Sequence, residues 1–121
     1  KNIRDWSFVE DHCDAIIDVL IKGKSGESYN ISAGNEIDNI TIIKKILTII
    51  GKPLENVEFV EDRPGHDFRY SMESTKIRNT LEWSQKKKFE EGLKKTIDWY
   101  LENKEWWMNL NKEILDATPW K

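Results

Sequence analysis

The sequence predicts an α/β fold that is rich in helices and has few, short strands. Apolar residues recur at helical spacing in residues 9–21, 40–50 and 89–101, and two β-like runs, Glu27–Ile31 and Val57–Val60, lie between these segments. Because strands that alternate with helices are typical of a parallel, covered sheet, we expect the two runs to lie in one. Two short strands do not form a stable sheet by themselves. The pattern therefore indicates one part of a larger fold.

Four helices are predicted, and the first two have residue types that favour their ends. Glu10 and Asp11 lie in the first turn of the helix at residues 9–21, where carboxylates interact favourably with the positive end of the helix dipole. Asp38 or Asn39 caps the second helix, since either side chain accepts hydrogen bonds from free amides. The apolar stripes of these helices are Val9, Cys13, Ile16, Ile17 and Leu20, and Ile40, Ile43, Ile46, Leu47 and Ile50.

The last third of the chain contains the other two helices. Ser74 is the predicted N-cap of a short helix that continues through Leu81 and Trp83. After the final helix the apolar pattern weakens, so we expect a domain over residues 1–107 and a tail over residues 108–121. The apolar residues of the final helix are Phe89, Leu93, Ile97, Tyr100 and Leu101.

Composition and charge exclude several classes of function. The net charge of −3 argues against a general nucleic-acid binder, whose surface is normally basic. No apolar run approaches the roughly 20 residues that span a bilayer, and no signal-peptide pattern opens the chain. Cys13 is the only cysteine and lies on the apolar side of a predicted helix, so we expect it to be buried. His12 and His66 are not spaced like metal ligands, so we expect no metal site. With a single cysteine the chain has no intrachain disulfide, so we expect a reducing, cytoplasmic location.

The segment Asp62–Asp67, which reads Asp-Arg-Pro-Gly-His-Asp, predicts a tight turn with anion-binding side chains. Pro64 fixes its backbone φ angle, and Gly65 allows a turn where a side chain would collide. The turn places the guanidinium of Arg63 and the imidazole of His66 on one small loop, and both groups can donate hydrogen bonds to phosphate oxygens. The loop is therefore either a clamp suited to a diphosphate or a surface turn whose side chains are merely solvated.

Short motifs along the chain match one known family in order. They are Arg4-Asp5-Trp6, Val9-Glu10-Asp11-His12, Gly26–Ile31, Gly34-Asn35-Glu36, the Asp62–Asp67 loop, Tyr70, Ser74, Lys76-Ile77, Leu81-Glu82-Trp83, Phe89–Leu93 and Thr96–Leu101. Together they resemble the carboxyl-terminal part of the dTDP-glucose 4,6-dehydratase family of extended short-chain dehydrogenases/reductases, over residues 4–107. The resemblance implies the helix-rich, substrate-binding part of an extended Rossmann-type enzyme.

The chemistry that the resemblance implies is a lyase reaction with a tightly bound NAD. Hydride leaves C4 of the glucosyl unit of dTDP-glucose, water is eliminated across C5 and C6, and hydride returns to C6. The product, dTDP-4-keto-6-deoxyglucose, serves deoxysugar biosynthesis. In the family, the dinucleotide loop, the Tyr-x-x-x-Lys pair and an acidic pair lie in the amino-terminal half.

None of these catalytic elements is expected in this chain. It has no strand that leads into a glycine-rich dinucleotide loop. Tyr100 and Lys104 match the Tyr-x-x-x-Lys spacing, but they lie at the end of a predicted helix and we interpret them as structural. Because the chain begins at Lys1 rather than at a methionine, we expect a fragment that is inactive alone, with NAD bound by a missing amino-terminal domain.

The resemblance implies that this chain forms the part of the substrate pocket that binds the nucleotide-sugar. It implies that Arg4 and Arg63 contact the diphosphate or the nearby ribose, with His66 as a further donor. Asn39 matches a ligand-contacting asparagine of the family, although a helix cap is a sufficient reason for asparagine there. The implied substrate-binding residues are Arg4, Asn39, Asp62, Arg63, Pro64, Gly65 and His66.

Departures from the family pattern leave alternatives open. Phe68 stands where the family often has a second arginine, and Ser32-Ala33 replaces a commoner Gly-Gly, so the bound sugar and base are less well specified. The chain also fits part of a nucleotide-sugar 4-epimerase or of a UDP- or GDP-sugar dehydratase. A hypothesis from a different functional class is a stand-alone binding module that catalyses no reaction. The full-length enzyme is expected to be a homodimer, and this chain is expected to expose an apolar surface where the dinucleotide domain docks.

Overall fold

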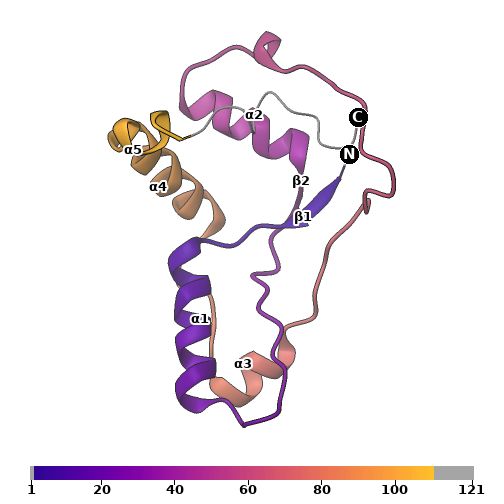
Figure 1. Cartoon of the computed structure of the whole chain (residues 1–121), viewed down its shortest axis with the longest axis vertical. Helices are drawn as coiled ribbons and strands as arrows, with labels where there is room; N and C mark the ends of the chain where they lie inside the picture. The colour runs from indigo at the N-terminus through magenta and orange to yellow at the C-terminus, as the bar shows by residue number, and fades with distance from the viewer. Residues whose placement is uncertain (1, 111–121) are drawn as a thin grey trace.

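The structure is a computed structural model, and it describes residues 2–110. Helices dominate it: α1 (Val9–Lys22), α2 (Asn39–Ile49), α3 (Thr75–Leu81), α4 (Phe89–Glu102) and α5 (Lys104–Met108), with a 3₁₀ turn η1 (Leu54–Asn56). α1 lies beside α3 at one end of the molecule, and α2 contacts α4 at the other (Figure 1). The strands β1 (Ile3–Asp5) and β2 (Glu36–Asp38) lie between these two groups of helices (Figure 1).

The prediction of a parallel sheet was wrong for the part of the chain that the structure describes. β1 and β2 pair antiparallel, with Ile3 opposite Asp38 and Asp5 opposite Glu36. A single parallel bridge joins Ile3 to Arg69 on the far side of β1. Each strand is three residues long, too short to show the alternation by which strands are recognised in a sequence.

The two predicted strands, Glu27–Ile31 and Val57–Val60, were also wrong. Neither run forms a backbone ladder with another segment among residues 2–110, and strand structure needs such a partner. Tyr29 and Ile31 pack against the core cluster of the α1–α3 end instead. Phe59 is 79% exposed, which shows that the second run has no covering layer among the described residues.

The helix predictions were confirmed for α1, α2 and α4 to within a residue or two. Asp38 is the cap of α2, because its carboxylate accepts hydrogen bonds from the backbone N–H of Thr41 at 3.0 Å and from its hydroxyl at 2.6 Å. The predicted apolar stripe of α2 is only partly buried. The one buried residue of this helix is Ile42, which does not belong to the stripe.

The short helix α3 differs from its prediction at both ends. Ser74 occupies the N-cap position, but its hydroxyl donates to the carbonyl of Ser32 and accepts from Arg78, so it does not cap the helix. The helix ends at Leu81, where Glu82 adopts a left-handed conformation with φ of 55°. Trp83 therefore lies beyond the helix.

The core is small and sits between α1 and α3. Its buried members are Ala15, Ile77, Leu81 and Trp83. The indole N–H of Trp83 donates to the backbone carbonyl of Asp11 at 3.1 Å, which ties the segment after α3 to α1.

The outward face of α1 is apolar and exposed. Leu20 is 83% and Ile21 72% exposed, and Cys13 is exposed rather than buried as predicted. The prediction for Cys13 failed because the described residues cover only the opposite side of the helix, around Ala15. The boundary expected at residue 107 falls inside α5, and most of the expected tail, residues 111–121, lies outside the described residues.

Candidate functional site

The predicted turn at Asp62–Asp67 is present, and its geometry follows from its sequence. Gly65 has a φ of 69°, a left-handed conformation that residues with a side chain rarely adopt. The backbone N–H of His66 donates to the carbonyl of Arg63 at 3.2 Å and closes the turn. The carboxylate of Asp62 accepts from the backbone N–H of Arg63 at 2.9 Å, which fixes the entry to the turn.

The residues after the turn lie against β1, and this places Arg4 beside the loop. The backbone N–H of Ile3 donates to the carbonyl of Phe68 at 2.8 Å, and the N–H of Tyr70 donates to the carbonyl of Ile3 at 3.1 Å. Residues separated by more than 60 positions thereby become neighbours. Arg69 holds the same segment to β2, because its guanidinium makes a bidentate ion pair with Glu36 at 2.7 and 2.9 Å.

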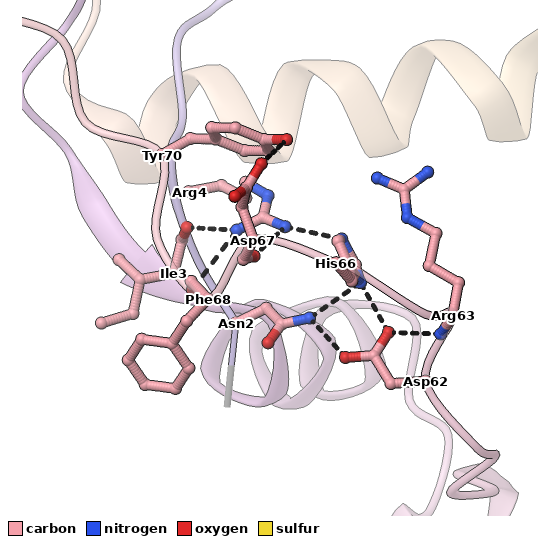
Figure 2. Close-up of polar contacts among 9 residues, drawn as sticks. All are labelled: Asn2, Ile3, Arg4, Asp62, Arg63, His66, Asp67, Phe68 and Tyr70. Carbon is pink, nitrogen blue, oxygen red and sulfur yellow. Dashed lines mark hydrogen bonds and ion pairs between the residues drawn. The ribbon is translucent and has the colours of Figure 1, made fainter.

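Arg4 is the centre of the polar cluster in Figure 2. Its guanidinium donates to Nε2 of His66 at 2.7 Å, to the carbonyl of Asp67 at 3.0 Å and to the carbonyl of Ile3 at 2.6 Å. Its Cζ lies 4.3 Å from the ring centroid of Tyr70, a cation–π contact. The planar donor fork of arginine suits this role, because it serves several acceptors in fixed directions.

His66 lies between Arg4 and Asp62, and its two ring nitrogens have different roles. An arginine nitrogen can only donate, so Nε2 accepts from Arg4. Nδ1 lies 2.5 Å from the Asp62 carboxylate and 3.1 Å from the side-chain nitrogen of Asn2, and the shorter contact, to a group that only accepts, assigns the proton to Nδ1. In this arrangement Nε2 accepts the hydrogen bond from Arg4, and the expectation that His66 donates to a bound anion stays a prediction.

The Asp62 carboxylate is stabilised in its charged form. The hydrogen bond from His66, together with a 3.2 Å bond from the side-chain amide of Asn2, lowers the pKa of Asp62 to about 2. Asp62 is therefore ionised at neutral pH and accepts from both neighbours. The backbone carbonyl of Asn2 accepts a hydrogen bond from the backbone N–H of Asn39 at 3.0 Å, which links the cluster to the start of α2.

Two of the predicted site residues are not held by the cluster. The guanidinium of Arg63 makes no hydrogen bond or ion pair with the other residues between 2 and 110, and it extends away from Asp62 in Figure 2. Asn39 does not cap α2, and its side-chain oxygen is buried with no hydrogen-bond partner among the described residues. Asn39 thus reaches the cluster through its backbone bond to Asn2.

Sequence reasoning missed three members of the cluster. Asn2 supports Asp62, the carbonyl of Asp67 accepts from Arg4, and the hydroxyl of Tyr70 donates to the Asp67 carboxylate at 2.5 Å. Spacing gives no signal for Asn2, since its role depends on a contact across 60 residues. The only available signal for Tyr70 was its place in the motif that follows the loop.

A cavity of about 310 Å³ opens beside Arg4, with Tyr70 and His12 in its wall. A groove of about 740 Å³ lies elsewhere, between the start of α1 and the aromatic residues of α4 and α5. Among residues 2–110, no group of histidine, cysteine or acidic side chains could hold a metal ion. Nor is any described helix long and apolar enough to cross a membrane.

The sequence of this chain is similar to those of known proteins. The family model described as GDP-mannose 4,6 dehydratase matches residues 1–96. The chain is 46% identical to the dTDP-glucose 4,6-dehydratase of Escherichia coli, over 91% of this chain and 33% of that protein. It therefore spans about a third of the length of the curated relatives that it matches.

Solved structures show the same similarity. The dTDP-glucose 4,6-dehydratase DesIV of Streptomyces venezuelae, determined with NAD and TYD bound, matches with a TM-score of 0.87 at 39% identity, over 91% of this chain and 34% of that one. The enzyme WbmF of Bordetella bronchiseptica, in complex with NAD⁺ and UDP, matches with a TM-score of 0.68 at 31% identity, over 85% of this chain and 30% of that one.

Proposed function

We propose, since this chain belongs to the GDP-mannose 4,6 dehydratase family, that it is the nucleotide-sugar-binding, carboxyl-terminal part of an NAD-dependent dTDP-glucose 4,6-dehydratase. The resemblance seen in the sequence agrees with the comparisons, in which dTDP-glucose 4,6-dehydratases match at 38–46% identity. In this proposal the longer protein is a lyase of deoxysugar biosynthesis, cytoplasmic and homodimeric. Its NAD and catalytic residues belong to an amino-terminal domain, and this chain supplies no catalytic residue.

The observation that carries the proposal is the position of Arg4 at the Asp62–Asp67 loop. Arg4 lies on β1, and its guanidinium is 2.7 Å from His66, which belongs to the same loop as Arg63. A diphosphate between the two arginines would accept charge-assisted hydrogen bonds from both guanidinium groups, each contributing about 1.5–3 kcal/mol. The exposed side chain of Arg63 has no competing partner among the described residues and can turn towards such a ligand.

Calorimetric titration of the chain with dTDP-glucose tests the proposal. The variant Arg63→Ala should weaken binding by roughly 10- to 100-fold, the loss expected for one such contact. The control Lys94→Ala also removes an exposed cation, but from α4, where Lys94 pairs with Asp98 on the same helix. Equal affinity of the wild type and the Arg63 variant for dTDP-glucose would contradict the assignment of the loop as a diphosphate clamp. A similar loss of affinity in the Lys94 variant would show a non-specific charge effect.

A second candidate keeps the enzyme class and changes the nucleotide. The match to WbmF, whose structure contains UDP, favours a UDP-sugar enzyme, although its identity and TM-score are lower. Competition between dTDP-glucose and UDP-glucose for the chain separates the two, because tighter binding of the UDP-sugar contradicts the first assignment.

The exposed apolar face of α1 is where we expect the amino-terminal domain to dock. Ile16 and Ile17 are each 51% exposed, and Leu20 and Ile21 are more exposed still. Such a continuous apolar surface is unusual on an isolated monomer. Addition of the separately expressed amino-terminal domain of a relative should suppress the binding of a hydrophobic dye to this chain, and an unchanged dye signal would contradict the assignment.

A further inference from the structure

We propose that binding of a diphosphate at the Arg4–His66 cluster is coupled to the uptake of one proton by His66. The inference rests on the proposed function, because it concerns the same site, and it adds a proton to the binding reaction. The proton comes from solvent and binds Nε2 of the imidazole. No other co-reactant is needed.

The starting state is fixed by hydrogen-bond chemistry. Arg4 can only donate to Nε2 of His66, and the ionised Asp62 can only accept from Nδ1. A neutral imidazole with its proton on Nδ1 satisfies these two contacts together, while the Asn2 amide, 3.1 Å from Nδ1, donates to Asp62. The side chain of His66 is 20% exposed, so water has limited access to replace either partner.

An anion changes the balance at Nε2. Phosphate oxygens only accept hydrogen bonds, so they cannot approach the lone pair of Nε2 favourably, and they compete with it for the Arg4 guanidinium. A proton on Nε2 turns His66 into a donor and removes this competition. Asp62, which already accepts from Nδ1 at 2.5 Å, is placed to stabilise the resulting imidazolium.

The charges around His66 favour proton uptake when an anion binds. Arg4 faces it from β1, and Asp62, Arg63 and Asp67 belong to its own loop. Two cations and two carboxylates leave this group near neutrality, so a doubly charged diphosphate adds negative charge that a proton on His66 partly offsets.

Neighbouring elements add little further charge. The two charged groups of β2 are already engaged, Glu36 by Arg69 and Asp38 by Thr41. Asn2 is uncharged, and the hydrogen bond to Asp67 raises the pKa of Tyr70, which keeps the phenol neutral. His66 is therefore the group of the cluster that can change its charge when the ligand binds near neutral pH.

Calorimetry in two buffers with different heats of ionisation measures the coupling. dTDP-glucose is the ligand, because both of its phosphates are esterified and do not titrate near neutral pH. We expect uptake of up to one proton, and an affinity that rises by up to about tenfold for each pH unit by which the pH is lowered over the range where this proton is taken up. His66→Gln, which keeps a neutral acceptor near Nε2, should bind without proton uptake, whereas the control His12→Gln should retain the uptake.

The outcomes separate the two proposals. Binding whose heat is the same in both buffers overturns the coupling and leaves the proposed function standing, as does uptake that is lost in His12→Gln and kept in His66→Gln. Absence of binding by the wild type overturns both. Nitrogen chemical shifts of His66 in the free chain test the starting state, and they remain informative if His66→Gln does not fold. They should report the neutral tautomer with the proton on Nδ1, and an imidazolium or the other tautomer at neutral pH overturns the inference.

Discussion

Replacement of Arg4 by lysine tests whether the guanidinium fork, rather than its charge, organises the loop. Arg4 makes three hydrogen bonds of 3.0 Å or less, to Ile3, His66 and Asp67. A lysine nitrogen at one point cannot reach all three acceptors, so Arg4→Lys loses about two of these bonds. Because the acceptors are partly open to water, each lost bond costs about 0.5–1.5 kcal/mol, and the free energy of unfolding falls by about 1–3 kcal/mol.

Urea unfolding followed by tryptophan fluorescence measures this loss. For a chain of this size, 1 kcal/mol corresponds to roughly 3–6 °C in melting temperature, so thermal unfolding gives a second reading. Arg69→Lys is the matched control, because it alters a bidentate pair with Glu36 that is largely exposed, and it should have a smaller effect. Equal stability of Arg4→Lys and the wild type, with unchanged affinity for dTDP-glucose, would refute the role given to the fork.

Three further perturbations have expected outcomes that follow from the geometry. Gly65→Ala should lower stability by about 1–2 kcal/mol, because the φ of 69° is strained for alanine, while Gly65→Asn should cost less in the same urea titration. Ile77→Ala removes a fully buried side chain and should cost about 2–5 kcal/mol, whereas Leu20→Ala, at an 83% exposed position, should change stability by less than about 0.5 kcal/mol. Asp62→Asn should lower the melting temperature at pH 7, and the difference from wild type should disappear as the pH falls from about 4 to about 2, since a carboxyl with a lowered pKa stabilises the fold only while it is ionised. Glu61→Gln, which removes a carboxylate that makes no hydrogen bond among residues 2–110, should show no such pH-dependent difference.

The longer helices α1, α2 and α4 were predictable because their signals are local. The apolar spacing in residues 9–21 and the cap at Asp38 act within a few residues of the backbone that they organise. The strands were not predictable, because a strand depends on a partner elsewhere in the chain. Glu27–Ile31 has strand-forming residues and no ladder among the described residues, whereas Ile3–Asp5 has little signal and a partner in β2.

The sequence by itself determined the turn of the Asp62–Asp67 loop, because Pro64 fixes its backbone φ angle and Gly65, next to it, can adopt a positive φ. It could not decide what the side chains of that loop do. The parallel bridge between Ile3 and Arg69 brings Arg4 to His66, and that contact makes the imidazole an acceptor rather than a free donor. Hydrogen-bond roles depend on which groups meet in space, and only the tertiary structure brings together groups that lie 62 residues apart.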